Sequence, residues 1–227
     1  MNVEEIKRIK AKSDGTTLYE HTCMVIETGL KLLQSLSLSN DARAFLNKHF
    51  LQSAILHDLG KVHPTFQKRL NGDKYASIRH ELVSVWFAET FLEIDNAVLF
   101  AIGTHHKSVE SHSCKKSLSM LDLNGISVSI DEGAYLHDSE GTMCLETLQS
   151  WLSLFSAEFI YRKKKLDKIS SAFCYMFRES KQKKVVPCAD ERLQFSLMRA
   201  FLQAADHLAS GGQIEIPDYQ MISLDDF

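Results

Sequence analysis

The chain lacks the features that mark secreted, disulfide-rich and membrane proteins. Its five cysteines are odd in number and scattered, with no CxxC pair, which argues against a disulfide framework and a thiolate zinc site. No run approaches the roughly 20 apolar residues of a membrane-spanning helix. The charged amino terminus, MNVEEIKRIKAKSDG, has no apolar segment of a secretory signal. These absences predict a reduced, cytoplasmic compartment and no membrane.

Residues that interrupt helices are also scarce. Three prolines and ten glycines in 227 residues leave few breaks, so the composition favours a mostly helical fold. The length suits one domain with a sizeable core and is short for two. A net charge of −3 excludes nucleic-acid binding through overall charge, so any such binding must use local basic patches.

Apolar residues recur at helical spacing in several segments. The pattern predicts helices over residues 18–36, 41–59, 78–92, 94–104, 145–161, 165–178 and 190–210. Thr16 or Thr17 is expected to cap the first, and the second is expected to end near Gly60. Alternating residues near 125–137 predict a small β-hairpin within an insertion at about 108–140. We therefore expect an all-α fold, a single-domain helical bundle over residues 1–212, followed by a tail or linker over 213–227.

One set of side chains consists of metal-ligand types placed on different predicted helices. The set is His21, the pair His57-Asp58, His80, the pair His105-His106, and Asp206. Each alone has an ordinary interpretation, such as a boundary histidine or an exposed carboxylate. Four of the five positions lie at helix ends, however, and separate helices of a bundle can converge on one metal site. The remaining histidines do not fit this order and are interpreted as ordinary: His49, His63, His112, His137 and His207.

The same motifs carry a family resemblance. LYEHT, AILHDLGKVHPTFQKRL, SIRHELVS, GTHH and AADHLAS resemble the HD phosphohydrolase superfamily, and within it the HD nuclease domain of the CRISPR type I nuclease–helicase. HDLGK is general to the superfamily. The continuation to Phe66-Gln67, the RHE triplet and the HH pair narrow the resemblance to the CRISPR branch. The resemblance covers about residues 18–210, although 108–190 contribute little.

The resemblance implies a two-metal site in which Asp58 is both a ligand and a catalytic residue. His21, His57, Asp58 and Asp206 would hold one ion, and His80, His105 and His106 would hold the second, with Asp58 as the bridge. A shared carboxylate offsets part of the repulsion between two cations, and a water between them would be the nucleophile. Imidazole and carboxylate ligands suit Mn²⁺, Fe²⁺, Co²⁺, Ni²⁺ or Mg²⁺, with the transition metals favoured, and one or two ions are compatible with the sequence.

Two cationic side chains beside these motifs are candidates for substrate binding. Lys61, about one turn after His57, either points its ammonium at a bound phosphate and takes part in catalysis, or is a cation favoured by the dipole at a helix carboxyl end. Arg79, next to His80, is a second candidate phosphate contact.

The leading hypothesis is a metal-dependent nuclease that cuts single-stranded DNA in CRISPR type I interference. One alternative is an HD phosphohydrolase or phosphodiesterase of small nucleotides, and another is a non-catalytic module that keeps the fold. The sequence contains no GxxxxGK[ST] phosphate-binding loop of a helicase motor. The resemblance therefore implies two partners besides single-stranded DNA, a fused or separate helicase and a CRISPR surveillance complex.

Overall fold

The computed structural model describes residues 1–74, 78–106, 142–162 and 189–211. The regular elements in these ranges are α1 (Val3–Ile6), α2 (Leu18–Ser35), α3 (Asn40–Leu56), the 3₁₀ turn η1 (Leu59–Val62), α4 (Pro64–Leu70), α5 (His80–Phe91), α6 (Asn96–Thr104), α8 (Thr142–Leu152) and α10 (Ala189–Ser210). β pairing there is confined to two isolated bridges. The predicted all-α fold is therefore confirmed. The predicted hairpin near 125–137 and helix over 165–178 lie outside the described residues.

The long helices begin where the sequence supplies a side-chain cap. Thr17 Oγ1 accepts a hydrogen bond from the Glu20 N–H, and the Glu20 carboxylate accepts one from the Thr17 N–H at 2.9 Å. This capping box satisfies two N–H groups that have no partner within α2. Ser39 caps α3 in a similar way by accepting from the Ala42 N–H. The caps fix the start of each helix, and His21 lies in the first turn of α2.

The carboxyl end of α3 differs from the prediction. The helix ends at Leu56, and the chain then tightens into η1, which contains Gly60. The short helix α4 follows, and it was not predicted. It begins at Pro64, a residue tolerated at the first helical position because the N–H there needs no helical partner.

The prediction of helix up to residue 161 was wrong, because α8 ends at Leu152. The segment beyond it pairs with the end of α5 instead. The Glu93 N–H donates to the Ile160 carbonyl, and the Arg162 N–H donates to the Phe91 carbonyl, each at 2.8 Å. These partners are distant in sequence, so helical spacing within residues 145–161 could not reveal them.

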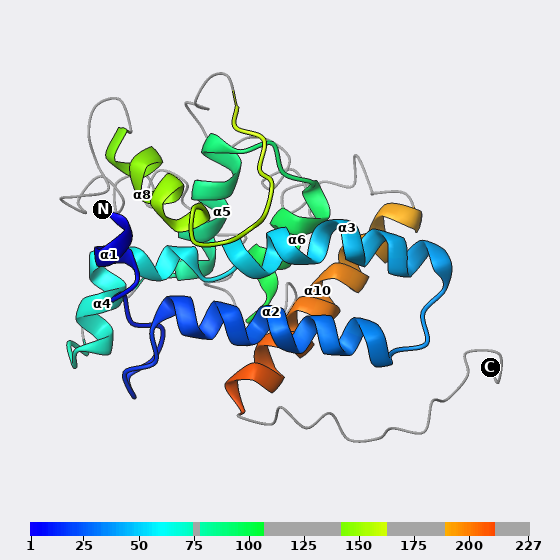
Figure 1. Ribbon diagram of the computed structural model, residues 1–227, viewed down its shortest axis with the longest axis horizontal. Coiled ribbons are helices and arrows are strands. Elements are labelled where there is room, and N and C mark those ends of the chain that lie inside the picture. Colours follow the sequence, from blue (N-terminus) through cyan, green and yellow to red (C-terminus); the bar gives the residue numbers. More distant parts are fainter. Residues whose placement is uncertain (75–77, 107–141, 163–188, 212–227) are drawn as a thin grey trace, which may run out of the picture.

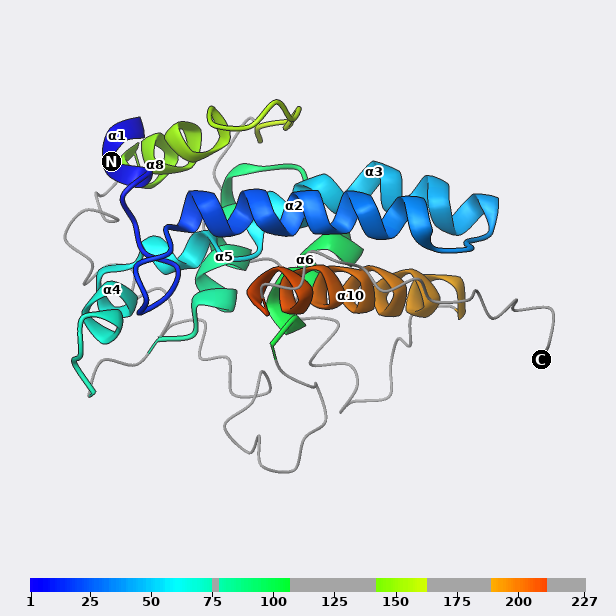
Figure 2. The same ribbon diagram turned by 60° about the horizontal axis from the view of Figure 1, so that its bottom comes forward.

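The helices pack around two hydrophobic clusters. Helices α2 and α3 lie side by side, and α10 lies against α2, α3 and α6 (Figures 1 and 2). One cluster joins these four helices and includes Val25, Phe50, Ala101 and Leu202. The other joins η1, α5, α6 and α8 and includes Leu59, Val83, Leu99 and Trp151. Among the described helices, none has the length and hydropathy required to span a lipid bilayer.

Side chains from distant helices hold the carboxyl ends of α3 and α6. Trp151 Nε1–H on α8 donates to the Ile55 carbonyl at 2.8 Å. Arg199 Nε–H on α10 donates to the Thr104 carbonyl at 3.1 Å. The last carbonyls of a helix have no intrahelical partner, so each of these bonds contributes about 0.5–1.5 kcal/mol. They also fix the direction in which the chain leaves each helix.

Candidate metal centre

All seven candidate ligands converge on one place in the fold. His21 comes from α2, His57 and Asp58 from the junction of α3 and η1, His80 from the start of α5, His105 and His106 from the end of α6, and Asp206 from α10. Six of them are buried, and His106 has 33% of its side chain exposed. Ionisable side chains are rarely buried unless they are paired or bind an ion, so this cluster is the candidate functional site.

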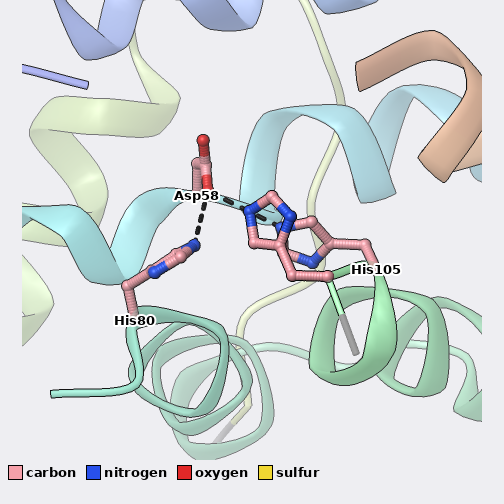
Figure 3. A group of neighbouring side chains, drawn as sticks. Asp58, His80 and His105 are labelled. Atoms are coloured by element: carbon pink, nitrogen blue, oxygen red, sulfur yellow. Dashed lines mark ion pairs between the residues drawn. The ribbon is translucent and has the colours of Figure 1, made fainter. Parts of the chain in front are cut away.

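Asp58 lies at the centre of the cluster, and its two carboxylate oxygens face different imidazoles. Oδ1 lies 3.0 Å from His80 Nε2 and 3.7 Å from His105 Nε2 (Figure 3). Oδ2 lies 3.3 Å from His21 Nε2 and 3.4 Å from His57 Nε2. A carboxylate with one oxygen toward each of two donor sets has the geometry needed to bridge two cations.

Asp206 provides a second carboxylate near the same imidazole nitrogens that Asp58 Oδ2 faces. Its Oδ1 lies 3.1 Å from His21 Nε2 and 4.0 Å from His57 Nε2. Its Oδ2 lies 3.9 Å from Nδ1 of the exposed His106. The structure therefore brings Asp206 into the cluster, within 4.0 Å of candidate ligands of both expected ions.

Donor atoms in the described part of the chain form four groups in which all atoms lie within 4.8 Å of one another. The groups are Asp58, His80, His105 and His106; His21, His57 and Asp58; His57, His105 and Asp206; and His106, Asp206 and His207. The first two match the two expected ligand sets, apart from Asp206. The fourth contains His207, which the sequence analysis interpreted as ordinary, and this group lies at the exposed edge of the site.

The tautomers of His57 and His105 follow from the helix ends. Nδ1–H of His57 donates to the Ala54 carbonyl, and Nδ1–H of His105 donates to the Ile102 carbonyl, both at 2.7 Å. A carbonyl can only accept, so Nδ1 carries the hydrogen, and Nε2 is the ring nitrogen that faces Asp58. The carbonyls are free for this bond because they belong to the last turns of α3 and α6.

The atoms that face the centre have no hydrogen bond of regular geometry within the described part of the chain, although the Lys61 ammonium forms an ion pair with Asp58 Oδ2. They are Nε2 of His57, His80 and His105 and both oxygens of Asp58. A buried polar atom without a hydrogen bond costs about 1–3 kcal/mol, and a divalent cation among them would satisfy all of these atoms together. Imidazole nitrogens and carboxylate oxygens without thiolates fit Mn²⁺, Fe²⁺, Co²⁺, Ni²⁺ or Mg²⁺. These residues therefore fit a divalent metal centre.

Both carboxylates are ionised at neutral pH. Burial opposes the charge on Asp58, but the Lys61 ammonium, 2.6 Å from Oδ2, and the His57 imidazole hold the pKa of that carboxyl well below its usual range. Burial also opposes the charge on Asp206, where hydrogen bonding from His21 and the neighbouring His57 imidazole keep the pKa below its usual value. Ionised carboxylates are the form that binds a cation.

His106 forms the open edge of the centre. Burial and the neighbouring His105 imidazole lower the pKa of His106 to about 3. The ring is therefore neutral at pH 7 and able to act as a metal ligand. Because a third of its side chain is exposed, this is the side from which a substrate can approach.

The two candidate substrate contacts are placed differently from each other. Lys61 is buried, and its Nζ lies against Asp58 and 5.7 Å from the centroid of the Phe66 ring. Arg79 is partly exposed, and its Nη2 lies 3.4 Å from Oε1 of Glu81. Lys61 thus lies in the centre, whereas the guanidinium of Arg79 is engaged by a carboxylate beside it.

The sequence analysis missed the residues that hold the ligands in place, including Glu81, Trp151 and Arg199. Glu81 is buried and follows His80 directly. The signal that could have found it is the position of His80 at the start of a helix, where no preceding helical turn offers a carbonyl to the ring. Trp151 and Arg199 left no local signal, because their partners are backbone carbonyls of other helices.

Comparison with known proteins agrees with this arrangement. The family model described as Cas3, HD domain, matches residues 15–213, a span that includes every candidate ligand from His21 to Asp206. A search of curated proteins finds no significant match.

Proposed function

Because the chain belongs to the Cas3 HD domain family, a family of metal-dependent HD nucleases of CRISPR systems, we propose that it cuts single-stranded DNA during type I interference. Membership makes the chain a metal-dependent hydrolase of the HD phosphohydrolase superfamily. The observation that carries the proposal is the position of Asp58, whose two oxygens face two separate imidazole pairs.

The proposal assigns each ligand to one of two ions. His21, His57, Asp58 and Asp206 hold the first ion, His80, His105 and His106 hold the second, and Asp58 bridges them. The short distances among Asp58, His80, His105 and His106 and among His21, His57 and Asp58 support this division, although Asp206 also lies close to His57 and His105 together. Such ions, when bound, supply an activated water and stabilise negative charge on phosphate oxygens. The high imidazole content favours a transition metal over Mg²⁺.

The residues of the chain hold the reacting groups in place and limit access to them. Asp58 and Asp206 remain ionised, and the helix-end carbonyls keep His57 and His105 in the tautomer that exposes Nε2. The scissile phosphate enters on the side of His106, the most exposed of the candidate ligands. A flexible single strand can bend into a mostly buried centre, whereas a duplex is stiff over about 150 base pairs. This difference supports a single-stranded substrate.

Lys61 is proposed to contact the substrate phosphate. In the structure its ammonium is 2.6 Å from Asp58 Oδ2. A divalent ion at that oxygen would repel the ammonium, which would then turn toward the added negative charge of a phosphate. We expect Lys61→Met to lower the cleavage rate about 10²-fold and to leave metal content unchanged. Initial rates on labelled single-stranded DNA and metal analysis by plasma mass spectrometry test both parts.

Lys31→Met is the matched control for Lys61→Met. Lys31 lies on α2 with 40% of its side chain exposed, in an ion pair with Glu27, and exposed pairs contribute little to stability. The control should cleave at the wild-type rate. An unaltered cleavage rate for Lys61→Met would show that Lys61 has no part in the mechanism. A loss of bound metal would show that Lys61 holds Asp58 in position instead.

The proposed activity is tested with circular single-stranded DNA, duplex DNA and a panel of nucleotides, each with Mn²⁺, Ni²⁺ and Mg²⁺ in turn. We expect cutting of the circle, faster with Mn²⁺ or Ni²⁺ than with Mg²⁺, and none after treatment with EDTA. Duplex DNA should be cut only when a helicase partner unwinds it. Turnover of nucleotides without cleavage of DNA would favour the alternative, a phosphohydrolase of small nucleotides.

A further inference from the structure

His80 differs from His57 and His105 in how its ring can be held. A histidine that binds a metal through Nε2 needs a partner for Nδ1–H, because that partner fixes the tautomer and the ring orientation. His57 and His105 follow helices and use carbonyls of the preceding turn. His80 is the first residue of α5, so α5 has no preceding turn whose carbonyl could hold the ring.

A carboxylate, that of Glu81, lies beside His80 Nδ1 instead, at the distance of an ion pair. His80 Nδ1 lies 3.6 Å from Glu81 Oε2, while His80 Nε2 lies 3.0 Å from Asp58 Oδ1. The two nitrogens of one ring thus face two carboxylates, one of them at the metal centre and the other outside it. The Phe66 ring packs edge-on against the His80 ring, with centroids 5.0 Å apart, and restricts its rotation.

The Glu81 carboxylate is itself paired with a guanidinium. The Glu81 side chain is buried, and Oε1 lies 3.4 Å from Nη2 of Arg79. An ionised carboxylate can only accept hydrogen bonds, so it selects the ring form in which Nδ1 carries the hydrogen.

We propose that Glu81 is a positioning residue that orients His80 for the second metal ion, and that Arg79 holds Glu81 in place for this task. This inference rests on the proposed function, in which His80 is a ligand. Loss of an outer partner of a metal-binding histidine typically weakens metal binding 10- to 100-fold. The effect should fall on the ion held by His80, His105 and His106 and spare the ion held by His21, His57 and Asp206.

The test is a titration with Mn²⁺ in which free Mn²⁺ is counted by electron paramagnetic resonance. Wild-type protein should take up two ions per chain. Glu81→Leu should bind the second 10- to 100-fold more weakly and the first with wild-type affinity, within about twofold. Glu81→Gln should bind the second ion with an affinity between those of the wild type and Glu81→Leu, because its amide oxygen still accepts a hydrogen bond. The matched control is Glu89→Leu, an equally buried glutamate about two turns further along α5 that belongs to none of the described donor groups.

A second measurement needs no variant and decides the question even if Glu81→Leu does not fold. In Zn²⁺-loaded protein with ¹⁵N-labelled histidine, nuclear magnetic resonance should show His80 with Nδ1 protonated and Nε2 coordinated. Coordination through Nδ1, or an unchanged second affinity in folded Glu81→Leu, would overturn the role of Glu81. If wild-type protein takes up no second ion, the two-metal assignment of the proposed function is rejected. This result is distinct from the results that reject only the role of Glu81.

Discussion

Asp58→Asn is expected to abolish metal-dependent cleavage, with a rate at least roughly 10³-fold below wild type. Each Asp58 oxygen faces its own imidazole pair, so an amide in either orientation turns an N–H₂ group toward one pair. An N–H₂ group donates hydrogen bonds and does not bind a cation. The variant also loses the negative charge that two neighbouring cations would share. We expect uptake of Mn²⁺ to fall from two ions per chain to one or none.

The matched control for Asp58→Asn is Asp41→Asn. Asp41 lies exposed in the first turn of α3, where the same chemical change touches no part of the centre. Asp58→Asn also removes the partner of Lys61, so circular dichroism must show that the variant is folded at the temperature of the assay. A folded Asp58→Asn that keeps both ions and cleaves within tenfold of wild type would reject the bridging role.

Several candidate ligands could be found from the sequence because their helices begin or end within a few residues of the predicted positions. Apolar spacing placed His57 and His105 near the carboxyl ends of two helices and His80 near the start of another, and the structure agrees within a few residues. These are positions at which backbone groups without helical partners are available to hold a ring. The order of residue types along the chain then supplied the grouping. The local pattern was therefore sufficient for the candidate centre, and the assignment of each ligand to an ion stays a prediction.

Features that depend on contacts between distant segments were not predictable. The end of α8 is set by pairing of residues 160–162 with residues 91–93. The turn η1 depends on α5, since the Gly60 N–H donates to Ser84 Oγ at 2.8 Å. Glu81 could be recognised as a positioning residue only after Asp58 was seen to occupy the other nitrogen of His80. Helical periodicity reports which face of a helix is buried and says nothing about its partner.

Gly60→Ala should disrupt both the fold and the second metal position. A Cβ at Gly60 would lie 2.0 Å from the His80 carbonyl oxygen and 2.8 Å from the Ser84 nitrogen. Both are backbone atoms of α5, so no side-chain rotation can relieve the overlap, and η1 must move away from α5. Overpacking of this kind typically costs about 1–3 kcal/mol. Urea unfolding of the metal-free protein should show a free energy of unfolding that is lower than wild type by this amount.

The same displacement should weaken binding of the second ion about tenfold or more, because it separates Asp58 Oδ1 from His80 Nε2, which are 3.0 Å apart. The Mn²⁺ titration measures this loss. Gly211→Ala is the control, since a Cβ there meets its nearest atom at an ordinary 3.4 Å. Wild-type Mn²⁺ affinity in a destabilised Gly60→Ala would mean that Asp58 and His80 keep their spacing without the close approach of η1 to α5. Loss of affinity together with stability would show that the packing of one glycine against a helix start sets the geometry of the metal centre.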